Sequence, residues 1–299
     1  MMPIGLAGAY GGRILQGFAE ACLYTGAAAW AVEVAGVHRS AQALGYVSSG
    51  IWGGISAGPV IGNWLGTFTH AAAFQLAAAM AAFGLALLVQ EDFQPRRYKS
   101  GHALLSPSLL TSGLAIGFVN VHYPVITGFL ILFLARHGGS GPAAFSTYAL
   151  VILLSRFFLG GLPDRVRPAI TFYSGLAAMA TGLLVLASGP KPIFAVSAAG
   201  LLGFGFSFPW SSVASTVLRR TPAENHGSVV GVLSAFYDFF VGAGSFLAGY
   251  IADRHGYSAA FLMAAVALTG AALAGRFVFN AQTTELAVLP EETLERSVC

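Results

Sequence analysis

Nine apolar stretches, each long enough to cross a bilayer, alternate with short polar connections along this chain. A helix needs about 20 mostly apolar residues to span the hydrocarbon core. Because lipid offers no partner to backbone N–H and C=O groups, a spanning segment must be a helix or part of a closed barrel. The lengths favour helices, and we expect spans at Leu6–Val34, Ala43–Gly66, Ala71–Val89, Ser108–Ala135, Ala144–Leu162, Ala169–Ser188, Ile193–Leu218, Val229–Ala252 and Ala259–Phe279.

The composition agrees with an all-α, polytopic transmembrane bundle. Charged residues make up 9% of the chain, whereas a soluble domain has about 25%. The net charge of +3 is small and scattered, so we expect no nucleic-acid partner. No nucleotide-binding glycine loop, metal-ligand cluster or nucleophile elbow is present, and Cys22 and Cys299 form no metal or disulfide pattern. We therefore expect no enzyme activity, no cofactor and no metal.

Lysine and arginine alternate between rich and poor connections. The odd-numbered connections and the C-terminal tail hold ten of these cations, and the even-numbered connections hold three. By the positive-inside rule, the odd set and the C-terminus are predicted to be cytoplasmic, in a cell (inner or plasma) membrane. Nine crossings then leave Met1 outside, and we expect that the chain lacks its true N-terminus.

The longest polar interruption, Gln90 to His102, divides the spans into three and six. We expect a partial N-terminal bundle over residues 1–90, a cytoplasmic linker over 91–107, a six-helix C-terminal bundle over 108–280 and a mobile cytoplasmic tail over 281–299. The tail has too little apolar content to fold alone.

An internal repeat adds to this division. The hexad Gly160-Gly161-Leu162-Pro163-Asp164-Arg165 recurs 89 residues later as Gly249-Tyr250-Ile251-Ala252-Asp253-Arg254, and a weaker echo begins at Gly62. Three related three-helix units are plausible, and neighbouring units would be inverted, as in many secondary transporters. The alternative is that glycine and Asp-Arg are simply common at helix ends.

Three motifs give the chain a resemblance to a known family. The first span carries Arg13-Ile14-Leu15-Gln16-Gly17, the second carries Gly54-x-x-x-Gly58-Pro59-x-x-Gly62, and Asp164-Arg165 follows the fifth. In this order they resemble the Arg-x-x-Gln-Gly signature of helix four, the Gly-Pro motif of helix five in drug/proton antiporters, and the loop motif between helices eight and nine of the major facilitator superfamily. The resemblance implies nine spans of a twelve-helix fold whose first three helices are absent.

Departures from the family pattern weaken parts of this resemblance. Val166-Arg167-Pro168 follows Asp164-Arg165 where the family has Gly and basic residues, and Asn63 stands where a second glycine is common. The absent helices also include the first loop motif, so a complete site cannot be built from this chain alone.

The first span carries candidates for a substrate and ion pathway. Arg13, Glu20 and Tyr24 lie at a spacing that places them on one helix face, with Gln16 and Gly17 beside them. Charges inside a membrane usually face a cavity or a partner. The resemblance implies that this helix lines the central cavity, with Arg13 organising a polar network and Glu20 exchanging protons; the alternative is that Arg13 extends from a helix end into the interface.

Other spans add polar and aromatic candidates. Asp238 is a second acid within a span, either a proton carrier or a structural hydrogen-bonding group. We favour Asn120 and Tyr123 as substrate contacts, with Pro124 kinking their helix. His122 is either a proton relay or an interhelical hydrogen-bonding group. The aromatic run Phe204 to Trp210 either holds a greasy or cationic substrate, with Trp210 in the pathway, or faces lipid.

The remaining candidates concern gating. Gly54, Gly58 and Gly62 form a small-residue strip beside Pro59, which predicts tight helix contact at a bend. The resemblance implies a seal between two bundles and favours export, whereas plain packing is the alternative. It also assigns Arg156, Asp164 and Arg165 to an inner gate.

These observations predict a secondary active transporter, a monomer whose partners are a small-molecule substrate, protons and the lipid bilayer. We expect proton-coupled export of a small organic or amphipathic molecule by alternating access. An uptake permease for a sugar or organic acid, and a non-transporting fragment, are the alternatives.

Overall fold

The structure is a computed structural model that describes residues 5–69, 71–89, 106–189, 191–222 and 225–288. Within these residues every regular element is a helix, as the sequence predicts. The helices are α1 (Gly5–Ala35), η1 (Val37–Arg39), α2 (Ser40–Gly66), α3 (Ala72–Val89), α4 (Pro107–Asn120), α5 (His122–Arg136), α6 (Gly141–Leu159), α7 (Leu162–Arg165), α8 (Pro168–Ala187), α9 (Pro192–Phe206), α10 (Pro209–Leu218), α11 (His226–His255) and α12 (Tyr257–Val288).

Six of the nine predicted spans are confirmed as helical segments long and apolar enough to cross a membrane, all of them between Pro107 and Asn280. The other three predicted spans coincide with α1, α2 and α3, which lie outside that set of six. The predicted linker falls almost wholly on residues 90–105, outside the described part of the chain.

The C-terminal helix extends beyond its apolar segment, which ends at Asn280. Helix α12 continues to Val288, eight residues beyond the expected end of the bundle at residue 280. The sequence Ala281-Gln-Thr-Thr-Glu-Leu-Ala-Val contains several good helix formers and neither glycine nor proline, so nothing in it stops the helix. The first residue after this sequence that is expected to stop a helix is Pro290.

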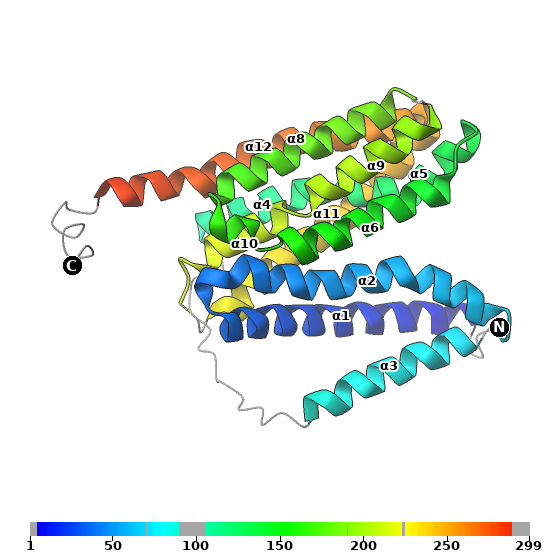
Figure 1. The fold of residues 1–299 in the computed structure, drawn as a ribbon, viewed down its shortest axis with the longest axis horizontal. Coiled ribbons are helices and arrows are strands. Elements are labelled where there is room, and N and C mark those ends of the chain that lie inside the picture. The colour runs from blue at the N-terminus through cyan, green and yellow to red at the C-terminus, as the bar shows by residue number, and fades with distance from the viewer. Residues whose placement is uncertain (1–4, 70, 90–105, 190, 223–224, 289–299) are drawn as a thin grey trace.

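Consecutive spans run antiparallel, so their connections fall into two groups (Figure 1). The α1–α2 and α10–α11 connections and α7 lie at the end of the molecule where α12 also ends, on the left of Figure 1. The α5–α6 and α8–α9 connections lie at the opposite end. These two groups correspond to the cation-rich and cation-poor connections of the sequence.

Prolines and serines fix where several helices begin. The Ser106 hydroxyl accepts a hydrogen bond from the Leu109 N–H at the start of α4, and Ser140 caps α6 in the same way through Ala143. Pro107 follows its cap directly, at a position where its missing N–H leaves no hydrogen bond unmade.

Two spans are broken in the middle, each just before a proline. The fourth predicted span divides at Val121 into α4 and α5, and the seventh divides at Ser207 and Phe208 into α9 and α10. Pro124 and Pro209 cannot donate to the carbonyls four residues earlier, so the helical hydrogen-bond ladder is interrupted at both points. The fourth span is therefore interrupted close to Pro124, where the sequence predicts a kink.

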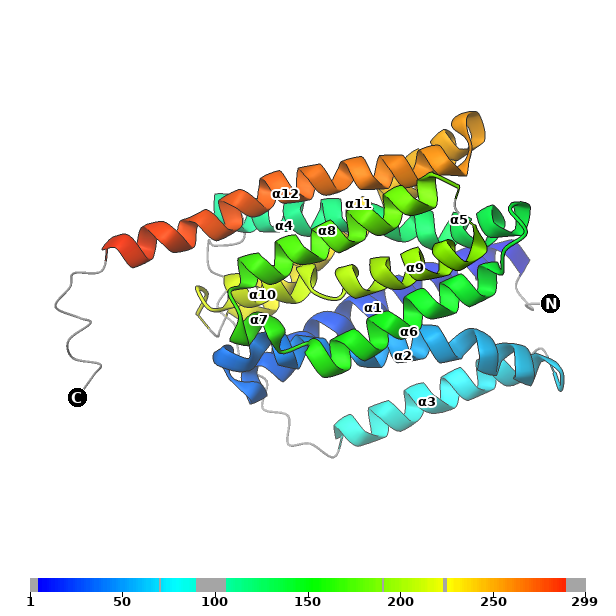
Figure 2. The same cartoon turned by 45° about the horizontal axis from the view of Figure 1, so that its top comes forward.

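Small residues let the helices of the C-terminal bundle approach closely. On α8, a Cβ atom added at Gly175 would lie 2.7 Å from the Gly205 carbonyl oxygen of α9, and one at Gly182 would lie 2.8 Å from that of Ala198. Association between membrane helices depends on such packing because lipid is as apolar as the side chains. Helices α1 and α2 contact this bundle, whereas α3 lies at its margin against α2 (Figure 2).

The α8–α9 contact yields a stability prediction. Gly182→Val forces two backbones apart, and overpacking of this kind costs about 1–3 kcal/mol. We expect a lower thermal unfolding midpoint for the purified variant in detergent. Gly242→Val on α11 is the matched control, because nothing lies within 4 Å of a Cβ atom there. Equal midpoints for both variants would contradict this account of the packing.

Candidate functional site

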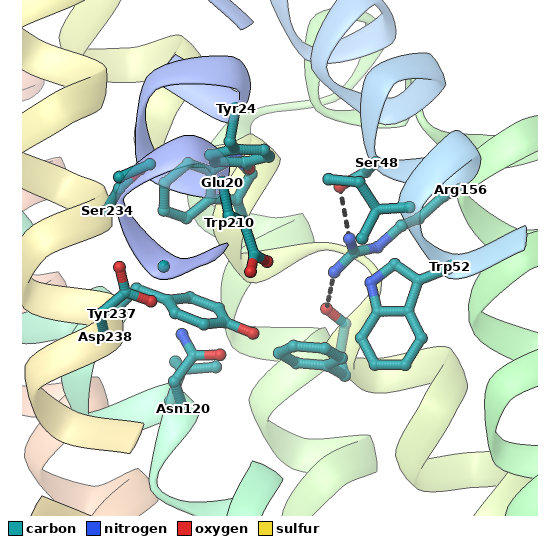
Figure 3. Close-up of a pocket in the computed structure, with 15 residues that line it drawn as sticks. Glu20, Tyr24, Ser48, Trp52, Asn120, Arg156, Trp210, Ser234, Tyr237 and Asp238 are labelled. Atoms are coloured by element: carbon teal, nitrogen blue, oxygen red, sulfur yellow. Dashed lines mark hydrogen bonds between the residues drawn. The ribbon is translucent and has the colours of Figure 1, made fainter. Parts of the chain in front are cut away.

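A cavity of about 380 Å³ lies between α1 and α2 on one side and the C-terminal bundle on the other. Its size is within the range of small-molecule sites. Seven helices contribute to its wall (Figure 3). The lining residues are Gly17, Glu20, Ala21, Tyr24, Ser48, Ile51, Trp52, Val119, Asn120, Arg156, Phe206, Trp210, Ser234, Tyr237 and Asp238.

Two acids reach the cavity from different helices. Glu20 comes from α1 and Asp238 from α11, where it lies beside Tyr237 and Ser234 (Figure 3). Ionised groups are costly in hydrocarbon and cheap beside water, a partner or a polar ligand. The cavity is therefore the environment in which both carboxylates can persist within a membrane span.

The opposite wall carries one cation, Arg156 of α6. Its side chain is 5% exposed, Nη1 donates a hydrogen bond to the Ser48 hydroxyl of α2, and Nη2 donates to the Phe206 carbonyl at 3.4 Å. The guanidinium carbon lies 5.6 Å from the Trp52 ring centroid. Hydrogen bonds and an aromatic face thus hold a charge that is always present.

Aromatic rings form most of the remaining wall. Trp210 of α10 contacts Tyr24 of α1 at 5.8 Å and Tyr237 of α11 at 6.3 Å between ring centroids. Trp52 of α2 contacts Phe206 of α9 edge to face at 5.7 Å. Rings from both groups of helices therefore meet around the cavity and can hold an apolar or cationic ligand.

The two helix breaks lie at the cavity wall. Asn120 ends α4, and its Nδ2 donates to the Ile116 carbonyl at 2.7 Å while Oδ1 has no hydrogen-bond partner among the described residues. Trp210 is in the first turn of α10, and its Nε1 is likewise buried without a partner there. Interrupted helices commonly form substrate sites in membrane transporters, because irregular backbone is tolerated only where it lines a cavity.

A second cluster joins the two groups of helices at the end of the molecule that carries α7. Asp164 of α7 accepts hydrogen bonds from the Ala41 N–H at 3.3 Å and the Gln42 N–H at 2.9 Å, at the start of α2. Arg219, which follows α10, donates to the same carboxylate at 2.7 Å. Residue Arg39 gives α2 no side-chain cap, so Asp164 caps that helix from the other bundle and also meets its positive dipole end.

Comparison with known proteins agrees with this geometry. The sequence model of the Major Facilitator Superfamily (MFS) matches residues 4–244 and, in a second overlapping match, residues 144–297. The chain belongs to the Major Facilitator Superfamily. This is a family of multi-pass membrane transporters and not of enzymes.

Several curated MFS proteins are similar to the chain along most of its length. An uncharacterised MFS-type transporter of Salmonella typhimurium is 27% identical over 88% of the chain and 69% of its own length. Uncharacterised MFS-type transporters of Burkholderia mallei and Burkholderia pseudomallei are each 26% identical over 85% of the chain and 64% of their own length. The chain thus spans about two thirds of the relatives it matches.

The structure brings together five of the eight predicted pathway residues. Those that line the cavity are Glu20, Tyr24, Asn120, Trp210 and Asp238. Tyr123 is absent from the lining and packs behind it, with its ring 5.9 Å from that of Trp52. Gln16 is also outside the lining, and the side chain of Arg13 lies outside the described part of the structure.

The predicted MFS gate residues separate into two places. Asp164 forms the cap described above, next to the exposed Arg165, whereas Arg156 lies in the cavity wall. The sequence grouped them because Arg156 precedes Asp164 by about two helical turns. That separation is enough to move Arg156 from the end of the bundle to its interior.

The Gly-Pro strip does not make the expected close contact at Gly54, where a Cβ atom would meet nothing within 4 Å among the described residues. The surroundings of Gly58, Pro59 and Gly62 lie outside the described part of the structure. Helix α2 instead makes a close contact at Gly45, where a Cβ atom would lie 3.0 Å from the Cα of Gly160, just after α6. This contact lies near the Asp164 cap.

His122 is buried and makes an interhelical bond, the structural one of its two expected roles. Its Nδ1 lies 2.7 Å from the Val119 carbonyl and its Nε2 lies 3.0 Å from the Tyr148 hydroxyl. A carbonyl only accepts, so Nδ1 carries the proton and Nε2 accepts from Tyr148. His122 is not among the cavity-lining residues.

Sequence reasoning missed the contribution of α2 to the cavity and that of Arg219 to the Asp164 cluster. Ser48 and Trp52 form the α2 wall of the cavity, one turn apart, and Arg219 completes the Asp164 cluster. The only signal for Ser48 and Trp52 was their spacing of four residues in an otherwise small and apolar span.

The Asp164 cluster yields a prediction about the contact between the bundles. Asp164→Asn removes the charge that meets Arg219 and the α2 N-terminus, and we expect it to lower stability by about 1–2 kcal/mol. The check is the thermal unfolding midpoint of the purified protein. Asp253→Asn is the matched control, since Asp253 is the repeat equivalent and is exposed. A loss that is no larger than that of the control would contradict the capping role.

Gly17 gives a test of the cavity itself. It lines the cavity and a Cβ atom there meets nothing within 4 Å, so Gly17→Phe should fill the cavity without displacing the helices. We expect loss of transport with the unfolding free energy unchanged within about 0.5 kcal/mol. Gly50→Phe on α2, which is exposed and outside the lining, should keep transport. Full transport by the Gly17 variant would place the substrate elsewhere.

Proposed function

We propose that the chain forms the substrate pathway of a proton-coupled exporter of small organic or amphipathic molecules, operating by alternating access. The single observation that carries this proposal is the 380 Å³ cavity between the two groups of helices, with Glu20 and Asp238 in its wall. A midplane site at the contact between bundles is where a rocking transporter exposes its ligand first to one side and then to the other.

The two acids support proton coupling. A carboxylate in the cavity can hold a proton or the positive group of a ligand, but not both at the same time. A ligand that displaces the proton on binding therefore moves opposite to it when the site turns to the other side. Competition between a proton and the ligand for Glu20 or Asp238 therefore favours antiport, in which substrate and protons move in opposite directions, over symport.

The Asp164 cluster supports a gate at one end of the pathway. Three hydrogen bonds hold the start of α2 against α7 and Arg219, and the Gly45–Gly160 contact brings the helix backbones together nearby. If the cation-rich connections are cytoplasmic, as the positive-inside rule predicts, this is the cytoplasmic gate in its closed state. Opening it would require these contacts to break together.

Arg156 favours a second candidate, uptake of an organic acid. With both acids protonated, Arg156 is the one charge left among the cavity-lining residues, and it would attract an anion. Protons and anion would then bind together and move in the same direction. The direction of the driving gradient separates this candidate from export.

The test uses inside-out membrane vesicles and a panel of fluorescent dyes and labelled amphipathic amines. We expect uptake into vesicles whose lumen is acidic, and its collapse on addition of a protonophore. Glu20→Gln or Asp238→Asn should reduce gradient-driven uptake at least about tenfold, which corresponds to an activation barrier about 1.4 kcal/mol higher.

Glu33→Gln is the matched control, because Glu33 is an exposed acid on the same helix as Glu20 and lies outside the cavity lining. It should leave uptake unchanged. If the protonophore has no effect on transport, or if both cavity variants still transport, the proposal of proton coupling through these acids is contradicted. Uptake only into vesicles whose lumen is more alkaline than the medium would favour the uptake permease.

A further inference from the structure

Arg156 carries a buried charge that the described protein leaves without a carboxylate partner. Its recorded partners are the Ser48 hydroxyl, the Phe206 carbonyl and two aromatic faces, and its Nε has no hydrogen-bond partner among the described residues. Buried charges are normally paired, because an isolated one is costly. A guanidinium also has a fork of donors that fits an oxyanion with two bonds.

The acids that could pair with Arg156 lie across the cavity from it. Figure 3 shows Asp238 on one side, Arg156 on the other, and Glu20 between them. Among the described residues, the recorded ion pair joins Asp164 to Arg219, and none joins Arg156 to Glu20 or Asp238. The cavity thus has a positive wall and a negative wall separated by open space.

Polar atoms of neutral side chains also point to a ligand. Asn120 Oδ1, Trp210 Nε1 and Ser234 Oγ are buried without a hydrogen-bond partner in the described protein, and all three residues line the cavity. Native proteins leave few such atoms unpaired, and unpaired ones mark sites that another molecule completes.

We propose that the substrate is a zwitterion, with a carboxylate that binds Arg156 and an ammonium group that binds Asp238 or Glu20. This inference rests on the proposed transport function and names the substrate class of the same cavity. Its apolar body lies against Trp52, Trp210 and Tyr24, whose rings also line the cavity.

The charges explain why one molecule with both groups fits better than a simple cation or anion. A cation would leave Arg156 unpaired and be repelled by it, and an anion would be repelled by two carboxylates. A zwitterion pairs Arg156 with its carboxylate and one acid with its ammonium group. The other acid then remains available for a proton, and the loaded site is neutral once that acid is protonated.

The experiment measures equilibrium binding to the purified full chain by calorimetry, without any proton gradient. The probes share a body and differ in charge: L-phenylalanine, 2-phenylethylamine and 3-phenylpropionate, with the corresponding leucine and tryptophan series. We expect the zwitterion to bind about 10- to 100-fold more tightly than either analogue in at least one series, as expected for a charged hydrogen-bonded pair.

Variants then assign each wall. Arg156→Gln should remove the advantage of the zwitterion over the amine, because it weakens binding of the zwitterion and removes the charge that repels the amine. The double variant Glu20→Gln, Asp238→Asn should remove its advantage over the acid. Arg156→Lys keeps the charge without the planar fork and should retain part of the advantage. Arg136→Gln is the control, since Arg136 stacks on Tyr257 outside the cavity.

The proposal is overturned if in every series an amine or acid binds as tightly as its zwitterion, if no zwitterion of the panel binds, or if folded Arg156→Gln keeps the full preference. Unfolding midpoints of all variants identify any that fail to fold, in which case Arg156→Lys decides. If the preference for the zwitterion is present but transport is not coupled to protons, only the proposed exporter mechanism is contradicted. If transport is protonophore-sensitive but the zwitterion is not preferred, only this inference about the substrate is contradicted.

Discussion

The absence of hydrogen-bond partners in lipid is the constraint on which the rest of this structure depends. It forces each span to satisfy its own backbone, and the described chain accordingly consists of helices. The ladder is interrupted within two spans, at Val121 and at Ser207–Phe208, and residues on the edges of both breaks line the cavity. The interrupted helices therefore lie where the cavity is, and the cavity is the place at which irregular backbone is tolerated.

The same constraint governs the charges. Glu20, Arg156 and Asp238 come from three different helices, and the fold places all three on one cavity. Asp164 and Arg219 instead pair with each other and with the start of α2 at the end of the bundle. The separation gives two kinds of site: a cavity whose acids and arginine form no recorded ion pair with one another in the described part of the chain, and a contact whose charges are paired. The first suits ligand binding and the second suits a contact that opens and closes.

Much of the fold follows from the sequence because apolar run length, proline position and loop charge act locally. The nine predicted spans coincide with helical segments, and Pro124 correctly indicated a break. The positions of Glu20 and Tyr24 on one face of the first span, and of Asp238 in the eighth, also followed from helical spacing and the cost of intramembrane charge.

What the sequence could not give depends on contacts between distant segments. Asp164 binds the N–H of Gln42, which precedes it by 122 residues, and no local pattern links them. Ser48 and Trp52 lie in a span of small and apolar residues with no charge to indicate which face meets the cavity. Arg156 was assigned to the gate because it lies close in sequence to the loop motif at Asp164. The sequence does not show how far along the helix the cavity extends.

The most direct test of the account is whether the cavity is open to water within the membrane. In a background with Cys22→Ser and Cys299→Ser, the variants Asp238→Cys and Phe246→Cys place one thiol each on α11, in the cavity wall and at a side chain that is 85% exposed on the outer surface. A water-soluble, charged thiol reagent should modify position 238 and leave position 246, which the account places in lipid, unmodified. Protection of position 238 under all conditions, or equal reaction at both positions, would contradict the existence of a hydrated pathway.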